Sequence, residues 1–212
     1  MLFPALTTTL ATDPVRAGRL FTVGGRTLLV LLVPLVALPM LFAEEALTIW
    51  LGAAFAAESA PVLRWLTIGV FINCLARPVF ITLQGYGRPD LGAKANLAEL
   101  VPYILVLWWI IPWQGIIGAA MAWTARIAID TIILYIIAMR QIPAMRAAQA
   151  KVLLHTAGAV VVLVALTLPQ SLWLKGGLAL FIVALCGGIA LRELRQMLKW
   201  KRTGSDGTQT KQ

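Results

Sequence analysis

The chain has 212 residues, of which 60% are hydrophobic and 13% are charged, and its mean hydropathy is +0.85. Average soluble domains are about 45–50% apolar and about 25% charged, so this composition excludes an ordinary soluble fold. The formal net charge of +9 comes from basic residues scattered between apolar runs, which argues against a nucleic-acid-binding protein.

Residues 1–26 precede the first long apolar run. Residues 1–6 resemble the end of a helix whose beginning is absent, and Asp13, Arg16 and Arg19 follow where a signal peptide would carry its apolar core. We therefore expect the end of a truncated helix, then a basic cytoplasmic loop, and no cleavable signal peptide.

Apolar runs of nearly spanning length fill most of the remaining chain, since a helix needs about 20 apolar residues to cross a bilayer. We expect spans at about residues 27–43, 65–83, 97–113, 115–139, 152–169 and 172–191. The third and fourth spans are divided only by residues 112–115, whose Pro and Gly signal a tight turn. The expected fold class is an all-α polytopic membrane protein with about six transmembrane helices.

The segments between these spans complete the expected organisation. Residues 46–57 are apolar but too short to span and are flanked by Glu45 and Glu58, so we expect an interfacial turn or helix on the outer face. Residues 203–212 are rich in Gly, Ser and Thr, a composition typical of disorder. The parts are thus a four-helix unit (27–139), a cytoplasmic loop (140–151), an additional helix pair (152–191) and a basic, partly disordered cytoplasmic tail (192–212).

Orientation follows from the basic residues, because Lys and Arg accumulate in the short cytoplasmic loops of membrane proteins. Most of the Lys and Arg residues lie before the first span, between the second and third spans, between the fourth and fifth spans, or after the sixth span. The opposite loops carry only Arg64 and Lys175. Both termini are therefore expected to be cytoplasmic. Tryptophans cluster near the predicted outer ends, where an indole favours the interface: Trp50, Trp65, Trp108, Trp109, Trp113 and Trp173.

Charged side chains inside the apolar runs are the informative positions, because each costs about 2.5–3.5 kcal/mol on insertion scales. They are Arg77, Glu99, Arg126 and Asp130. Arg126 and Asp130 share a helix face at a spacing of four residues. They either neutralise each other as an ion pair or line a polar cavity, unless they lie nearer the interface than the spans suggest.

A polar stripe on the second span adds to these candidates. Asn73, Arg77 and Gln84 fall on one helix face, which must point to protein or water rather than lipid. Arg77 either contacts an anionic substrate or pairs with Glu99 or Asp130. Glu99 is either solvated at the mouth of its span or takes part in gating or proton coupling. The candidate substrate-cavity residues are Asn73, Arg77, Gln84, Glu99, Arg126 and Asp130.

Signatures of an enzyme are missing from the sequence. His155 is the single histidine, so it supports neither a catalytic triad nor a metal site. Cys74 and Cys186 lie in apolar segments and pack there as small hydrophobes. We expect no enzymatic activity, no catalytic residues, no cofactor and no metal.

Four stretches in a fixed order carry a family resemblance across residues 1–140. They are Phe3-Pro4 with Asp13 and Arg16; Trp50-Leu51-Gly52 to Phe55 with Leu63-Arg64; Gln84-Gly85-Tyr86-Gly87-Arg88-Pro89 with Glu99; and Gly115-Ile116-Ile117-Gly118-Ala119-Ala120 with Trp123, Arg126 and Asp130. Their order resembles the C-terminal lobe of the polysaccharide and O-antigen flippases, in the multidrug/oligosaccharidyl-lipid/polysaccharide exporter superfamily.

The resemblance implies a fold of two six-helix lobes around a central cavity, often followed by an extra helix pair. It implies flipping of a lipid-linked oligosaccharide across the inner membrane during O-antigen, capsule or exopolysaccharide assembly. The chain departs from this pattern because it lacks an N-terminal lobe. The expected partners are therefore membrane lipids, the lipid-linked oligosaccharide, and a separate N-terminal lobe or a second copy, without nucleic acid. The alternative is a non-transporting membrane scaffold or relic fragment in a glycan-synthesis complex.

Overall fold

The computed structural model describes residues 9, 13–167 and 171–206, with side chains as far as residue 189. It contains five helices that are long and apolar enough to cross a membrane, and the described ranges contain no strand. The all-α polytopic membrane fold is therefore confirmed. The expected end of a truncated helix (residues 1–6) and the last six residues of the expected tail lie outside the described residues.

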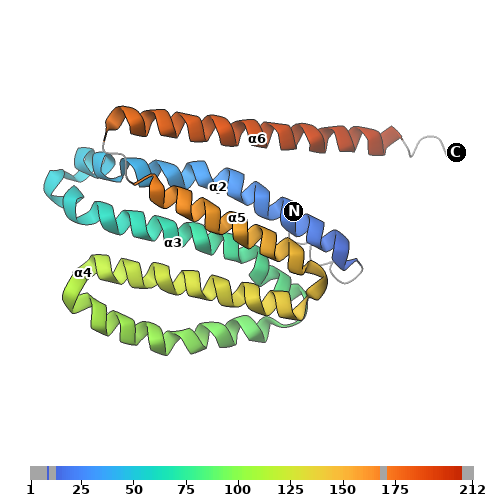
Figure 1. Cartoon of the computed structure of the whole chain (residues 1–212), viewed down its shortest axis with the longest axis horizontal. Coiled ribbons are helices and arrows are strands. Elements are labelled where there is room, and N and C mark those ends of the chain that lie inside the picture. Colours follow the sequence, from blue (N-terminus) through green and yellow to red (C-terminus); the bar gives the residue numbers. More distant parts are fainter. Residues whose placement is uncertain (1–8, 10–12, 168–170, 207–212) are drawn as a thin grey trace.

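The helices run side by side along the long axis of the molecule (Figure 1). They are α2 (Pro14–Leu51), α3 (Ala53–Gly85), α4 (Pro89–Gln141), the short 3-10 helix η1 (Pro143–Met145), α5 (Arg146–Ala165) and α6 (Leu172–Asp206). At one end of the bundle α2 and α5 begin, α3 ends, and α4 both begins and ends. We name this the basic end, because it carries Arg16, Arg19, Arg88, Lys94, Arg140, Arg146 and Lys151.

Helix α4 is a hairpin and not a single rod. A straight helix of its 53 residues would be about 80 Å long, far more than the ~30 Å hydrocarbon core of a bilayer. The backbone turns back at Gly115, whose φ of 56° is one that L-residues rarely adopt. Its two arms, residues 89–114 and 116–141, lie side by side (Figure 1) and correspond to the expected third and fourth spans. The five long helices thus supply six apolar crossings.

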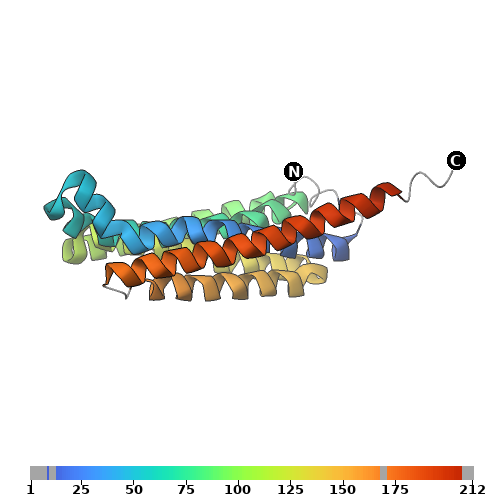
Figure 2. The ribbon, with the colours of Figure 1, turned by 90° about the horizontal axis from the view of Figure 1, so that it is seen from above.

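The expected interfacial element at residues 46–57 is not a separate piece. Helix α2 is non-helical at Phe42, continues to Leu51 and ends at Gly52, where φ is 89°, and α3 begins one residue later. The end of α2 and the start of α3 form a hook that bends away from the bundle axis (Figure 2). Glycine at position 52 permits this short connection, because a positive φ costs it little.

The structure places two helix ends away from the expected segment boundaries. The predicted loop at 140–151 shrinks to η1 and its flanks, since α5 already begins at Arg146 in a run of helix-forming Ala, Gln and Lys. The predicted tail at 192–212 is helical as far as Asp206, because α6 continues beyond residue 191. Residues 192–201 are rich in Arg, Leu, Lys and Gln, which favour a helix even outside an apolar span.

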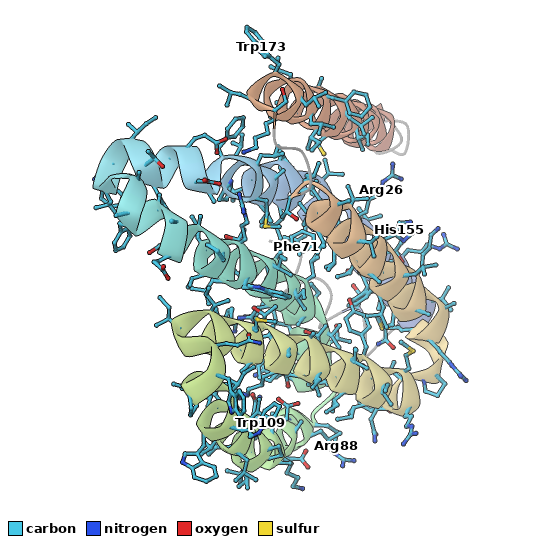
Figure 3. All side chains as sticks on the ribbon, turned by 60° about the vertical axis from the view of Figure 1, so that its left-hand side comes forward. Arg26, Phe71, Arg88, Trp109, His155 and Trp173 are labelled. Atoms are coloured by element: carbon cyan, nitrogen blue, oxygen red, sulfur yellow. The ribbon has the colours of Figure 1, made fainter. Side chains whose placement is uncertain are left out.

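Buried apolar side chains fill the centre of the bundle. Phe71 on α3 is fully buried and faces the inside of the molecule (Figure 3). Tyr135 from α4 and Met145 from η1 fill the half nearer the basic end. Within the described ranges α6 packs on α2 alone, and Figure 1 shows it along one edge of the bundle. Helices α2 to α5 therefore form the body, and α6 is a peripheral addition.

Candidate functional site

A small polar pocket lies between α3 and the two arms of α4. Its volume is about 220 Å³, and its polar lining comes from α3 (Asn73, Arg77), the first arm of α4 (Asn96) and the second arm (Arg126, Asp130). Its apolar lining consists of Ala76, Phe80, Ile127 and Leu134. We call this the polar pocket. Four of the six residues singled out in the sequence line it together.

Arg126 is the best-connected side chain of the polar pocket. Its Nε lies 3.7 Å from Oε2 of Glu99, and its Nη2 donates a 3.4 Å hydrogen bond to Oδ1 of Asn96. Its guanidinium carbon lies 5.2 Å from the centre of the Tyr103 ring, within the range of a cation–π contact. All three partners belong to the first arm of α4, so Arg126 joins the two arms of the hairpin.

Asp130 is placed differently from its neighbour on the same arm. Its Oδ1 is buried and has no hydrogen-bond partner among the described residues. The four-residue spacing would allow a pair with Arg126, yet the ion pair that the structure forms within 4.0 Å joins Arg126 to Glu99 across the hairpin. Asp130 is left as an acceptor that faces the pocket, because its side chain lines it.

The other candidates divide between the polar pocket and its surroundings. Arg77 is exposed and lines the pocket, and within the described ranges it forms no ion pair with Glu99 or Asp130. Glu99 is 9% exposed and reaches the site through Arg126. Gln84 is exposed near the end of α3 and is not part of the pocket lining. Of the polar stripe on α3, only Asn73 and Arg77 therefore line the polar pocket.

Sequence reasoning missed Asn96 and Tyr103, which both contact Arg126. A signal for them was present, because Asn96, Glu99 and Tyr103 are spaced by three and four residues and so share one helix face. The role of this face depends on the turn at Gly115, which brings the second arm, with Arg126, against it.

A second, mainly apolar cavity opens on the other side of the same ion pair. It measures about 620 Å³ and runs between the two arms of α4, with Glu99 and Arg126 in its lining. The remaining lining residues are Leu91, Lys94, Ala95, Ala98, Pro102, Tyr103, Val106, Ala122, Ala125, Ile129, Ile133 and Ile137. We call this the hairpin groove. Arg126 therefore lines both the polar pocket and a groove on the bundle surface, and its partner Glu99 lines the groove.

Close packing fixes the second arm of α4 against α3. The Thr124 hydroxyl donates a 2.7 Å hydrogen bond to the carbonyl of Trp65, which joins two helices 59 positions apart in sequence. At Gly69 an added Cβ would overlap the Trp123 ring, so the absence of a side chain allows the close approach. This contact sets the position of Arg126 one turn away.

Comparison with known proteins gives one informative relative. Over 101 residues, 48% of this chain, the sequence is 34% identical to a Shigella flexneri protein described as "Putative O-antigen transporter". The match covers 24% of that relative, so the matched part of this chain corresponds to about a quarter of the relative's length. No family model and no solved structure matches. This similarity supports an O-antigen flippase-like relationship and confirms the resemblance read from the sequence.

Proposed function

We propose that this chain is part of a transporter that flips a lipid-linked oligosaccharide across the inner membrane for polysaccharide assembly. The observation that carries the proposal is the polar pocket, in which two arginines, two asparagines and an aspartate meet inside an apolar bundle. Such groups are costly in hydrocarbon and mark substrate or ion pathways in membrane proteins. The similarity to a protein named as an O-antigen transporter supports the same function.

The side chains of the polar pocket suit an anionic, sugar-bearing ligand. Arg77 and Arg126 offer positive charge to a phosphate or pyrophosphate group, because guanidinium forms charge-assisted hydrogen bonds with such oxygens. Asn73 and Asn96 supply amide groups, and the unpartnered Asp130 oxygen accepts a hydrogen bond from a sugar hydroxyl.

We infer that a second membrane component completes the transport path. The pocket of about 220 Å³ is far smaller than a lipid-linked oligosaccharide, whereas ligand sites commonly measure about 300–1,000 Å³ for drug-sized molecules alone. The hairpin groove also leaves the Glu99–Arg126 pair bordering the bundle surface, where a charged pair requires water or protein rather than lipid. An N-terminal lobe, which the flippase pattern includes, is the proposed cover, with the basic end of the bundle facing the cytoplasm.

Complementation tests this proposal. The chain is expressed with and without a candidate N-terminal lobe in a strain that lacks its own O-antigen flippase, and surface polysaccharide is measured. Restoration by both halves together is the expected result, and restoration by the chain alone would assign the second component to another copy. Failure of both combinations, with both proteins found in the membrane, would reject transport in favour of a scaffold role.

A further inference from the structure

A basic cavity separate from the polar pocket lies between α2 and α5, near the basic end of the bundle. Its volume is about 430 Å³, and Thr22, Arg26, Leu29, Lys151, Val152 and His155 line it. Among the residues that the structure describes, its lining contains basic side chains and no Asp or Glu. Figure 3 places Arg26 and His155 on the same side of the molecule.

The backbones of α2 and α5 hold this cavity in shape. A Cβ added at Gly25 would lie 2.9 Å from both Cγ atoms of Val152, so the two helices meet here as closely as a glycine allows. Arg26 follows Gly25 directly, and Lys151 precedes Val152 directly. The contact therefore keeps two cationic side chains from different helices beside one cavity.

His155 adds a polar group that is oriented in advance. Its Nδ1 lies 2.5 Å from the carbonyl oxygen of Lys151, and because a carbonyl only accepts, Nδ1 carries a proton in this contact. His155 is part of the cavity lining. Apolar lining comes from Leu29, which lies one helical turn farther from the basic end than Arg26, so charge is followed by a hydrocarbon surface at greater depth.

We propose that this cavity binds the phosphate of an anionic phospholipid, with the acyl chains extending past Leu29 along α2. Basic pockets between transmembrane helices bind the head groups of anionic lipids, and each Lys or Arg near such a surface adds to the attraction. The mixed lining favours a lipid over a free ion, because a free phosphate would gain nothing from the apolar wall. The site is independent of the proposed transport function.

Native mass spectrometry of the full chain in detergent tests the site, with phosphatidylglycerol as the probe and phosphatidylcholine as the neutral comparison. Replacing Arg26→Gln together with Lys151→Gln is expected to weaken phosphatidylglycerol binding by about tenfold or more. The control pair Arg140→Gln with Arg146→Gln removes the same charge from exposed positions outside the cavity and is expected to change binding by less than about twofold. The single change Lys151→Gln, at an exposed side chain, serves if the double variant does not fold.

If both double variants weaken phosphatidylglycerol binding equally, or if neither weakens it, the site is overturned. Only a general attraction between a basic protein and an acidic lipid would then remain. An inorganic phosphate arm identifies the source of the ligand. Phosphate at millimolar concentration is expected not to displace the lipid. Displacement would overturn the assignment to a lipid and point to a soluble anion.

Discussion

Arg126 on the second arm of α4 lies 3.7 Å from Glu99 on the first arm, so one ion pair bridges the turn at Gly115. The Glu99 side chain is 10% exposed and that of Arg126 is 24% exposed. Removing either partner would leave the other charge in a mostly dry environment, which costs far more than a surface pair would.

The first prediction concerns the stability of this pair. Arg126→Gln is expected to lower the free energy of unfolding by about 3 kcal/mol, because it strands the Glu99 carboxylate. Adding Glu99→Gln should recover about 1–2 kcal/mol, the coupling energy expected of residues in contact. Unfolding in detergent, followed by circular dichroism, measures both. A matched cycle with Asp130→Asn should give a smaller coupling, and a larger one would mean that Asp130 is the true partner.

The second prediction separates Arg77 from Gln84, which share the stripe expected on α3. Arg77→Gln should reduce surface polysaccharide in a complementing strain while changing stability by less than about 0.5 kcal/mol, because its side chain is exposed and forms no described ion pair. Gln84→Ala, outside the polar pocket, should leave polysaccharide levels unchanged. Equal effects of the two changes would remove Arg77 from the proposed substrate contacts.

The third prediction concerns the contact between α3 and α4. Gly69→Ala is expected to destabilise the protein by about 1–3 kcal/mol, since the new methyl group overlaps the Trp123 ring. Gly158→Ala in α5 is the control, because a Cβ there meets no atom within 4 Å. It should be neutral or stabilise by up to ~1 kcal/mol through better helix propensity. Thermal unfolding of both variants compares them, and a harmless Gly69→Ala would show that the helices can separate.

The fourth prediction concerns the attachment of α6. Lys175, whose side chain is 8% exposed, donates a 2.5 Å hydrogen bond to Oε1 of Glu45 on α2. Lys175→Ala should speed hydrogen exchange of the α6 amides by about tenfold, equivalent to ~1.4 kcal/mol. The reason is that α2 is the one helix on which α6 packs within the described residues, so a weaker contact there loosens the whole of α6. Amides of α3 should not change. Glu44→Gln, an exposed carboxylate beside the pair, is the control, and an equal effect from it would implicate net charge instead.

The apolar crossings could be predicted from sequence because length and hydropathy suffice to define them, and Gly115 marked the hairpin turn. The partners of the buried charged side chains could not be predicted from the sequence. Arg126 has the Asp130 carboxylate four residues away on its own arm and the Glu99 carboxylate on the opposite arm. Which of the two pairs with Arg126 depends on how closely the arms approach each other. The extension of α6 beyond residue 191 was missed because its end is set by helix propensity and not by hydrophobicity.

The packing of α6 on α2 alone has a consequence for how the protein is made. Glu45 and Lys175 are 130 positions apart, so their helices meet only after everything between them has left the ribosome. Until then, the side of α2 that later receives α6 can rest against acyl chains, because lipid solvates its apolar surface as well as a helix does. Assembly of α2 to α5 therefore need not wait for α6, which can dock from the bilayer as a last step and be exchanged in evolution without repacking the body.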